Sequence, residues 1–189
     1  MAAVVERDAG ESEHEPGEIL ISHEQIQARL VELARQVTER YKGQKPLFVG
    51  VLTGAFILSG DFAVKLYEAG LTEAEFTFID AKSYGKGTQA GELKTDDRGI
   101  NVLGRHVVLL EDIADTGNSG KGATELMIAK GAASVAMLAL LDKPSRREVD
   151  FHPDYVGFTI EDIWVEGYGM DTGERGRGNP HIIYGPSKV

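Results

Sequence analysis

The 189-residue chain contains no cysteine, which excludes disulfide bonds, thiolate nucleophiles and sulfur-ligated metal sites. Long hydrophobic runs are also absent, since the longest, such as residues 132–141, fall well short of the roughly 18 apolar residues that span a bilayer. Residues 1–17 lack the basic start and the apolar stretch of a secretory signal peptide. We therefore expect a cytoplasmic protein with no membrane segment.

Basic residues are few relative to acidic ones. The 20 Lys and Arg residues against 30 Asp and Glu residues give a net charge of −10, which repels polyphosphate backbones, so we expect no nucleic-acid partner. Residues 1–17 combine several acidic side chains with few large apolar ones, and we expect a disordered acidic tail there. Residues 18–189 are predicted to form a single domain around one core.

The hydrophobic pattern alternates between strands and helices. A capping box at residues 22–25 opens a helical pattern that ends at Lys42, and further helices are predicted over residues 55–69 and up to Lys130. Short apolar runs predict the strands: residues 47–52, 75–81, 107–110, 134–141, 155–160 and 163–165. This alternation predicts an α/β fold with an open, mostly parallel twisted sheet and helices on both faces. Its ligand site is expected beyond the carboxyl ends of the strands.

The segment VVLLEDIADTGNS (residues 107–119) is the most informative part of the chain. It places acidic residues at the end of a buried strand and small hydroxylated residues at the start of a helix. The backbone N–H groups and hydroxyls of Thr116, Asn118 and Ser119 can receive a phosphate there, and the acids can meet ribose hydroxyls and Mg²⁺. A sugar-phosphate site is therefore favoured over the simpler interpretation that Glu111 and Asp112 are surface acids beside an ordinary helix cap.

This segment resembles the phosphoribosyl-pyrophosphate motif of type I phosphoribosyltransferases, and several further segments resemble the hypoxanthine-guanine branch of that family. The resemblance implies the parallel sheet predicted above plus a small hood built from the chain termini. It implies that Asp115 is the catalytic residue, which exchanges a proton with purine N7. The implied phosphoribosyl-binding residues are Glu111, Asp112, Asp115, Thr116, Gly117, Asn118 and Ser119.

The resemblance also implies a purine-binding site. By this resemblance Lys143 donates to the exocyclic oxygen of a 6-oxopurine, Trp164 stacks on the base, and the main chain of Val165 faces the base edge. An ammonium group presents donors only, so it would reject the amino group of adenine at that position.

The pyrophosphate-binding residues implied by the resemblance are Thr53, Gly54 and Arg177. Thr53 stands where many family members have lysine, so contact through the backbone of Thr53 and Gly54 is expected. Arg177 matches an arginine that contacts pyrophosphate, which a guanidinium can bind in a bidentate way. Because the preceding stretch is rich in glycine, Arg175 competes for that position.

Metal and flap residues complete the comparison with the family. The implied cofactor is Mg²⁺, with Glu111, Asp112 and Asp171 as its ligands. Ser83 and Tyr84 resemble the start of a mobile flap, which would exclude water from the active site.

The implied function is transfer of phosphoribose from phosphoribosyl pyrophosphate to N9 of hypoxanthine or guanine, giving IMP or GMP plus pyrophosphate. The expected partners are phosphoribosyl pyrophosphate and a 6-oxopurine base, and the expected assembly is a homodimer or homotetramer. Two alternatives stay open: a relative that prefers xanthine, and a phosphoribosyltransferase-like regulatory protein that binds RNA. The acidic charge of the chain disfavours the second.

Overall fold

A computed structural model describes residues 3–4, 14–80 and 99–186 of the chain. Within these residues the main sheet has six strands, all paired in parallel, in the order β1-β7-β6-β5-β3-β4. In chain order the strands are β1 (Ala3–Val4), β3 (Leu47–Leu52), β4 (Glu75–Asp80), β5 (His106–Ala114), β6 (Ser134–Asp142) and β7 (Tyr155–Thr159). The prediction of an open, parallel sheet is confirmed.

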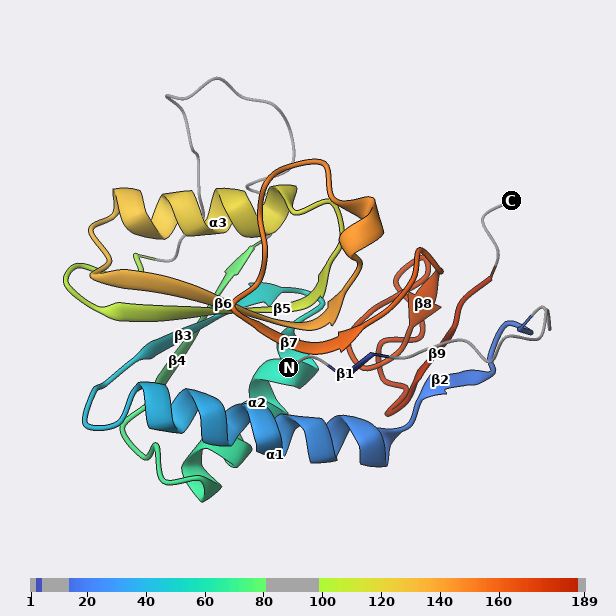
Figure 1. Cartoon of the computed structure of the whole chain (residues 1–189), viewed down its shortest axis with the longest axis horizontal. Coiled ribbons are helices and arrows are strands. Elements are labelled where there is room, and N and C mark those ends of the chain that lie inside the picture. Colours follow the sequence, from blue (N-terminus) through green and yellow to red (C-terminus); the bar gives the residue numbers. More distant parts are fainter. Residues whose placement is uncertain (1–2, 5–13, 81–98, 187–189) are drawn as a thin grey trace.

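Helices cover both faces of this sheet, as predicted. Figure 1 shows α1 (His23–Arg40) and α2 (Phe56–Glu68) on one face and α3 (Asn118–Ala129) on the other. The capping box at the start of α1 is complete: Gln25 N–H donates to the Ser22 hydroxyl at 3.3 Å, and Ser22 N–H donates to the Gln25 side chain at 2.8 Å. None of the helices in the described ranges is long and apolar enough to cross a membrane.

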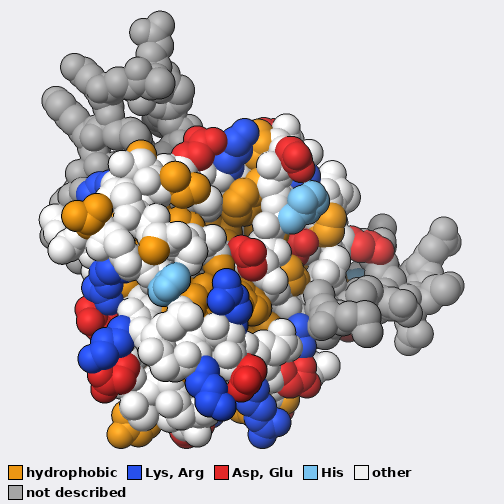
Figure 2. All heavy atoms as spheres, turned by 60° about the vertical axis from the view of Figure 1, so that its left-hand side comes forward, with side chains coloured by type: hydrophobic (Ala, Val, Ile, Leu, Met, Phe, Trp, Pro, Cys, Tyr) orange, Lys and Arg blue, Asp and Glu red, His pale blue; other side chains and the backbone are white. Residues whose placement is uncertain are grey.

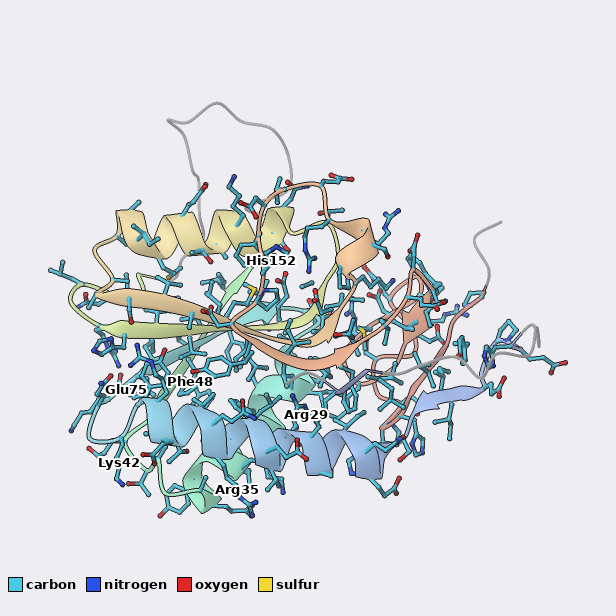
Figure 3. The ribbon with its side chains drawn as sticks, in the orientation of Figure 1. Arg29, Arg35, Lys42, Phe48, Glu75 and His152 are labelled. Carbon is cyan, nitrogen blue, oxygen red and sulfur yellow. The ribbon has the colours of Figure 1, made fainter. Side chains whose placement is uncertain are left out.

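Strand β5 separates two hydrophobic layers because successive side chains point to opposite faces of a sheet. Val108 and Leu110 pack toward α1 and α2, whereas Val107 and Leu109 pack toward α3. On the α1 side, the ring of Phe48 packs with two other phenylalanines of this layer, and Figure 3 labels Phe48 between the sheet and α1. Burial on both faces explains why the strand is apolar at every position from 107 to 110.

Arg29 joins α1 to β7, the strand that lies next to the edge strand β1. Its buried guanidinium donates to the carbonyl oxygens of Gly157 and Val156 in β7, at 2.9 Å each. Figure 3 labels Arg29 on the side of α1 that faces the sheet. A buried arginine is tolerated here because its donors meet fixed acceptors.

A small antiparallel sheet forms the predicted hood from segments near both termini. It has the order β2-β9-β8 and contains β2 (Ile19–Ile21), β8 (Val165–Glu166) and β9 (Ile182–Tyr184). It lies beside the carboxyl ends of the main strands, at the right of Figure 1. The last predicted strand was misplaced: residues 163 and 164 precede β8, whose pairing with β9 begins at Val165. That pairing partner is distant in sequence, so local hydrophobicity did not reveal the boundary.

The two ends of the predicted tail contact the folded domain. Residues 3–4 pair with Phe158 and Thr159 of β7, and the His14 ring stacks on the Tyr184 ring with centroids 4.1 Å apart. Residues 5–13 lie outside the described residues, so the disordered tail over residues 1–17 stays a prediction. The flap residues Ser83 and Tyr84 also lie outside the described residues.

Candidate active site

The candidate site lies where the carboxyl ends of β3, β5 and β6 meet, beside the hood. The register pairs Ala114 at the end of β5 with Asp142 at the end of β6, and Lys143 N–H then donates to the Ala114 carbonyl oxygen at 3.0 Å. The segments that follow these three strands therefore leave the sheet at the same edge. This is the edge at which ligands of open α/β sheets bind.

Glu111 points toward α3. Its carboxylate is only 5% exposed and accepts a hydrogen bond from the Ser119 hydroxyl at 2.5 Å. The pKa of Glu111 is raised to about 7, mainly by burial and in part by the negative charge of Asp112, while the hydrogen bond from Ser119 and the charge of Arg147 oppose the shift. The hydroxyl of Ser119 is therefore directed to Glu111, whereas the sequence predicted it at a phosphate.

Asp112 points to the opposite face and lies directly against Gly54. A Cβ atom at Gly54 would come within 1.8 Å of Asp112 Oδ2, so this contact requires glycine. Burial raises the pKa of Asp112 to about 6, and the charge of Asp171 contributes, whereas two backbone hydrogen bonds and Arg177 lower it. Adjacent residues of one strand thus carry carboxylates to two sides of the same site.

The turn before α3 presents backbone N–H groups. Gly117 adopts φ +85°, and a Cβ atom there would approach Arg147 Cδ to 2.8 Å. Among the described contacts, no side chain caps the first turn of α3, although Asn118 N–H donates weakly to the Thr116 hydroxyl at 3.3 Å. The side-chain amide of Asn118 also donates to the Glu148 carboxylate at 3.0 Å. The helix start is therefore available to an anion, mainly through its backbone.

Two arginines that the sequence analysis missed support this turn. Arg146 Nε donates to Asp115 Oδ1 at 3.1 Å and lies 3.6 Å from Asp162. Arg147 donates to the carbonyl oxygens of Ala114 and Asp115 and forms an ion pair with the largely buried carboxylate of Asp142. Their only sequence signal was two consecutive basic residues after a strand end. That signal does not indicate that the chain folds back onto the turn before α3.

Lys143 and Trp164 connect the end of β6 to the hood. Lys143 is 5% exposed, and its Nζ donates to the Ile163 carbonyl oxygen at 2.6 Å. Trp164 is 40% exposed, and its Nε1 donates to the Thr172 hydroxyl at 2.7 Å. Val165 follows as a buried residue of β8. The three predicted purine-binding residues therefore lie within one connected region, with part of the tryptophan ring open to solvent.

Asp171 and Arg177 form a pair on the loop after β8. Arg177 Nη2 lies 2.7 Å from Asp171 Oδ1, and Glu174 N–H donates to Asp171 Oδ2 at 2.7 Å. Arg175 instead lies exposed in the turn between them, where its backbone bonds to Thr172. Of the two arginines left open by the sequence, Arg177 is the one that contacts Asp171.

The turn that follows β3 contacts this loop through main-chain atoms. A Cβ atom at Gly169, which has φ +104°, would lie 2.0 Å from the Gly54 carbonyl oxygen. Thr53 is exposed beside it, and the peptide bond between Leu52 and Thr53 is cis. The segments predicted to bind pyrophosphate and metal, around Gly54, Asp112 and Asp171, are therefore assembled at one place.

The carboxylates are spread around the site. Considering only the described ranges, no three Asp, Glu or His side chains are grouped closely enough to hold a metal ion by themselves. Asp112 and Asp171 are near enough for the charge of one to raise the pKa of the other. A pair of carboxylates suits a cation that also takes oxygen atoms from a bound substrate.

Comparison with known proteins matches residues 18–172 to the phosphoribosyl transferase domain family. The chain is 39% identical over 171 residues to the hypoxanthine-guanine phosphoribosyltransferase of Bacillus subtilis, covering 89% of this chain and 93% of that protein. It is 41% identical over 166 residues to the bifunctional protein TilS/HprT of Listeria monocytogenes, covering 87% of this chain but only 25% of the length of that larger relative.

A solved structure supports the same relationship. Hypoxanthine phosphoribosyltransferase from Trypanosoma cruzi, in a substituted form complexed with the product IMP, superposes with a TM-score of 0.83 at 28% identity. The superposition covers 94% of each chain. The parallel sheet, the hood and the extent of these matches lead to one conclusion: the chain belongs to the phosphoribosyl transferase family.

Proposed function

We propose that this protein transfers the phosphoribosyl group of phosphoribosyl pyrophosphate to N9 of hypoxanthine or guanine, forming IMP or GMP and pyrophosphate. The observation that carries the proposal is the meeting of three features at one sheet edge. These are the open start of α3, the Asp112 carboxylate against Gly54, and the Asp171–Arg177 pair. The relatives named hypoxanthine or hypoxanthine-guanine phosphoribosyltransferase support it.

The sugar phosphate would bind at the end of β5. The backbone N–H groups of residues 116–119 would hold the 5′-phosphate, aided by the positive end of the α3 dipole. Glu111 and Asp112 would accept hydrogen bonds from the ribose hydroxyls. Its burial suits Glu111 to this place because a buried carboxylate gains more from a new donor than a solvated one does.

The pyrophosphate would lie between the Thr53–Gly54 turn and Arg177. Gly54 would offer its backbone, and the Arg177 guanidinium would contact the phosphate oxygens while it remains close to Asp171. Glu111, Asp112 and Asp171 would supply oxygen ligands to Mg²⁺ together with the substrate, because Mg²⁺ commonly binds one or two carboxylates plus phosphates. The chemistry expected of bound Mg²⁺ is neutralisation of charge on the leaving pyrophosphate.

The base would bind between the Trp164 ring and the end of β6. Lys143 would donate to the 6-oxo group, and the Val165 main chain would face the base edge. The bond from Lys143 to the Ile163 carbonyl oxygen keeps the ammonium group beside the tryptophan. A fixed donor at this point favours 6-oxopurines over adenine, whose amino group would leave both donors unpaired.

Asp115 would act as the general acid or base at purine N7. Its carboxylate stays partly accessible, and Arg146 Nε holds one oxygen; the other oxygen accepts no hydrogen bond within the part of the chain that the structure describes and could face a base. Arg147 fixes the main chain of the same turn through two carbonyl oxygens. Most of the rate should therefore come from positioning and charge stabilisation, with Asp115 moving a single proton.

An assay with purified protein, Mg²⁺ and phosphoribosyl pyrophosphate tests the proposal directly. Hypoxanthine and guanine should each give the corresponding monophosphate and pyrophosphate, while adenine should give none. Faster product formation with xanthine would replace the proposal with the xanthine-preferring alternative. The absence of nucleotide with every base would refute both.

The RNA-binding alternative has little support from the surface. Figure 2 shows one face of the molecule, on which Lys and Arg side chains are interspersed with Asp and Glu side chains. The net charge of −10 further opposes an RNA partner. Salt-dependent RNA binding without nucleotide formation would favour this alternative.

We further propose that the chain forms a homodimer or homotetramer through α2. Phe56, Val64 and Tyr67 lie on this helix and are exposed, although each is large and apolar. Exposed apolar residues along one helix are typical of an interface. Light scattering should give an oligomer for the natural chain and a smaller mass for Val64→Lys, and an unchanged mass would place the interface elsewhere.

A further inference from the structure

Tyr168 occupies a backbone conformation that is unusual for its residue type. It is 1% exposed and adopts φ +49°, between Gly167 at φ +98° and Gly169 at φ +104°. The left-handed region is disfavoured for side chains other than glycine, so other contacts must hold Tyr168 there.

The hydroxyl group of Tyr168 supplies such contacts. It donates to Asp61 Oδ2 on α2 at 2.5 Å. Gln27 on α1 donates to the same Asp61 oxygen at 2.6 Å and lies 3.4 Å from the Tyr168 hydroxyl. Burial and the hydrogen bond to Asp61 raise the pKa of Tyr168, so the hydroxyl stays a donor at physiological pH. The loop after β8 is thus fixed to two helices through one side chain.

The residue after Tyr168 lies at the centre of the candidate pyrophosphate site. The Gly169 carbonyl oxygen accepts from Arg177 Nη1 at 2.6 Å, and the Gly169 N–H donates to the Arg177 carbonyl oxygen at 2.9 Å. On its other side Gly169 lies directly against the Gly54 carbonyl oxygen. A shift of Tyr168 would therefore displace Gly169, and with it the relation between Arg177 and the Gly54 turn.

We propose that Tyr168 and Asp61 are positioning residues that hold the pyrophosphate-binding side of the active site in register. Tyr168 is buried behind the loop, Asp61 is partly buried, and both would act through Gly169. The hydrogen bond between them fixes Gly169, and Gly169 in turn aligns Arg177 with the Gly54 turn. This inference rests on the proposed function and adds to it two residues that the sequence analysis did not select.

The experiment is steady-state kinetics of Tyr168→Phe, which removes the hydroxyl and keeps the ring. We expect the KM for phosphoribosyl pyrophosphate, and the KM for pyrophosphate in the reverse reaction, to rise about tenfold, as for loss of one hydrogen bond to a charged group. The KM for hypoxanthine should change less than about twofold, because Lys143 is held through the Ile163 carbonyl oxygen, which precedes β8 in the chain. Asp61→Asn should give the same pattern, and the double variant should be no worse than either single one.

Tyr41→Phe is the matched control, since it removes another buried tyrosine hydroxyl at the far end of α1. It should leave all three KM values unchanged. If Tyr168→Phe does not fold, as judged by its thermal melting, Asp61→Asn carries the test. Equal changes in the KM values of base and phosphoribosyl pyrophosphate, or no change in either, would refute the positioning role. A natural chain that forms no nucleotide would instead refute the proposed function.

Discussion

Replacement of Glu111 by Gln should change how stability depends on pH. The folded state holds the proton of Glu111 up to a pKa of about 7, whereas the ordinary value is 4.5. Between these values the folded state binds more protons than the unfolded state, so the free energy of unfolding falls as pH rises. Gln has no such proton, and its side-chain oxygen can still accept the hydrogen bond from Ser119.

The magnitude follows from the difference between the two pKa values. A gap of 7 − 4.5 = 2.5 pH units, at about 1.4 kcal/mol per unit, corresponds to roughly 3 kcal/mol over the whole window. Most of it, about 2 to 3 kcal/mol, should fall between pH 5 and pH 8. Over that interval the natural chain should lose this amount of stability relative to Glu111→Gln.

Urea unfolding of both proteins at pH 5 and pH 8, at one fixed protein concentration and without ligand, measures the difference. The comparison between the two chains removes the contributions of all other titrating groups that the substitution leaves unchanged. An equal stability difference at both pH values would refute the conclusion that Glu111 is buried with a raised pKa. If the natural chain instead gained stability relative to Glu111→Gln from pH 5 to pH 8, the folded state would stabilise Glu111 as a carboxylate.

Three further substitutions test the geometry of the site. Gly54→Ala should lower kcat/KM more than about 100-fold, because the added Cβ would displace Asp112. Gly60→Ala is the control: a Cβ at Gly60 would have no atom of the described residues within 4 Å, so kcat/KM should change little. Asp115→Asn should lower kcat about 100-fold or more and change the KM for phosphoribosyl pyrophosphate less than about threefold, as steady-state kinetics would measure. Lys143→Met should lower kcat/KM for hypoxanthine by about 100-fold. IMP formation from hypoxanthine and phosphoribosyl pyrophosphate should still be detectable. An unchanged kcat/KM for hypoxanthine would remove Lys143 from base recognition.

The fold was predictable because its signals are local. Apolar runs such as residues 107–110 mark strands buried on both faces, and the capping box at residues 22–25 marks the start of α1. The order in which parallel strands are joined by helices then places residues 111–119 at the carboxyl edge of the sheet. The position of the site therefore followed from pattern and topology together.

The side-chain contacts within the site were not predictable from the same signals. The direction of Ser119 toward Glu111 depends on how α3 packs against β5, and the approach of Asp112 to Gly54 joins two strands through space. The contact of Asp171 with Arg177, and not with Arg175, depends on a glycine-rich turn whose shape is set by tertiary contacts. Sequence periodicity carries no information on such distances.

The contact between Gly169 and Gly54 also limits how this active site can change. Main chain meets main chain there: the three atoms nearest to a Cβ placed at Gly169 would all belong to the Gly54 backbone. A side chain at Gly169 would press on the Gly54 carbonyl oxygen and push the loops apart, whereas a side chain at Gly54 would displace Asp112. Adaptation to a different purine would consequently have to arise around Trp164 and Lys143, whose side chains can be exchanged without separating the backbone. Under the proposed function, main-chain contacts that tolerate little change would hold the pyrophosphate of one substrate, and exchangeable side chains would select the other substrate, the base.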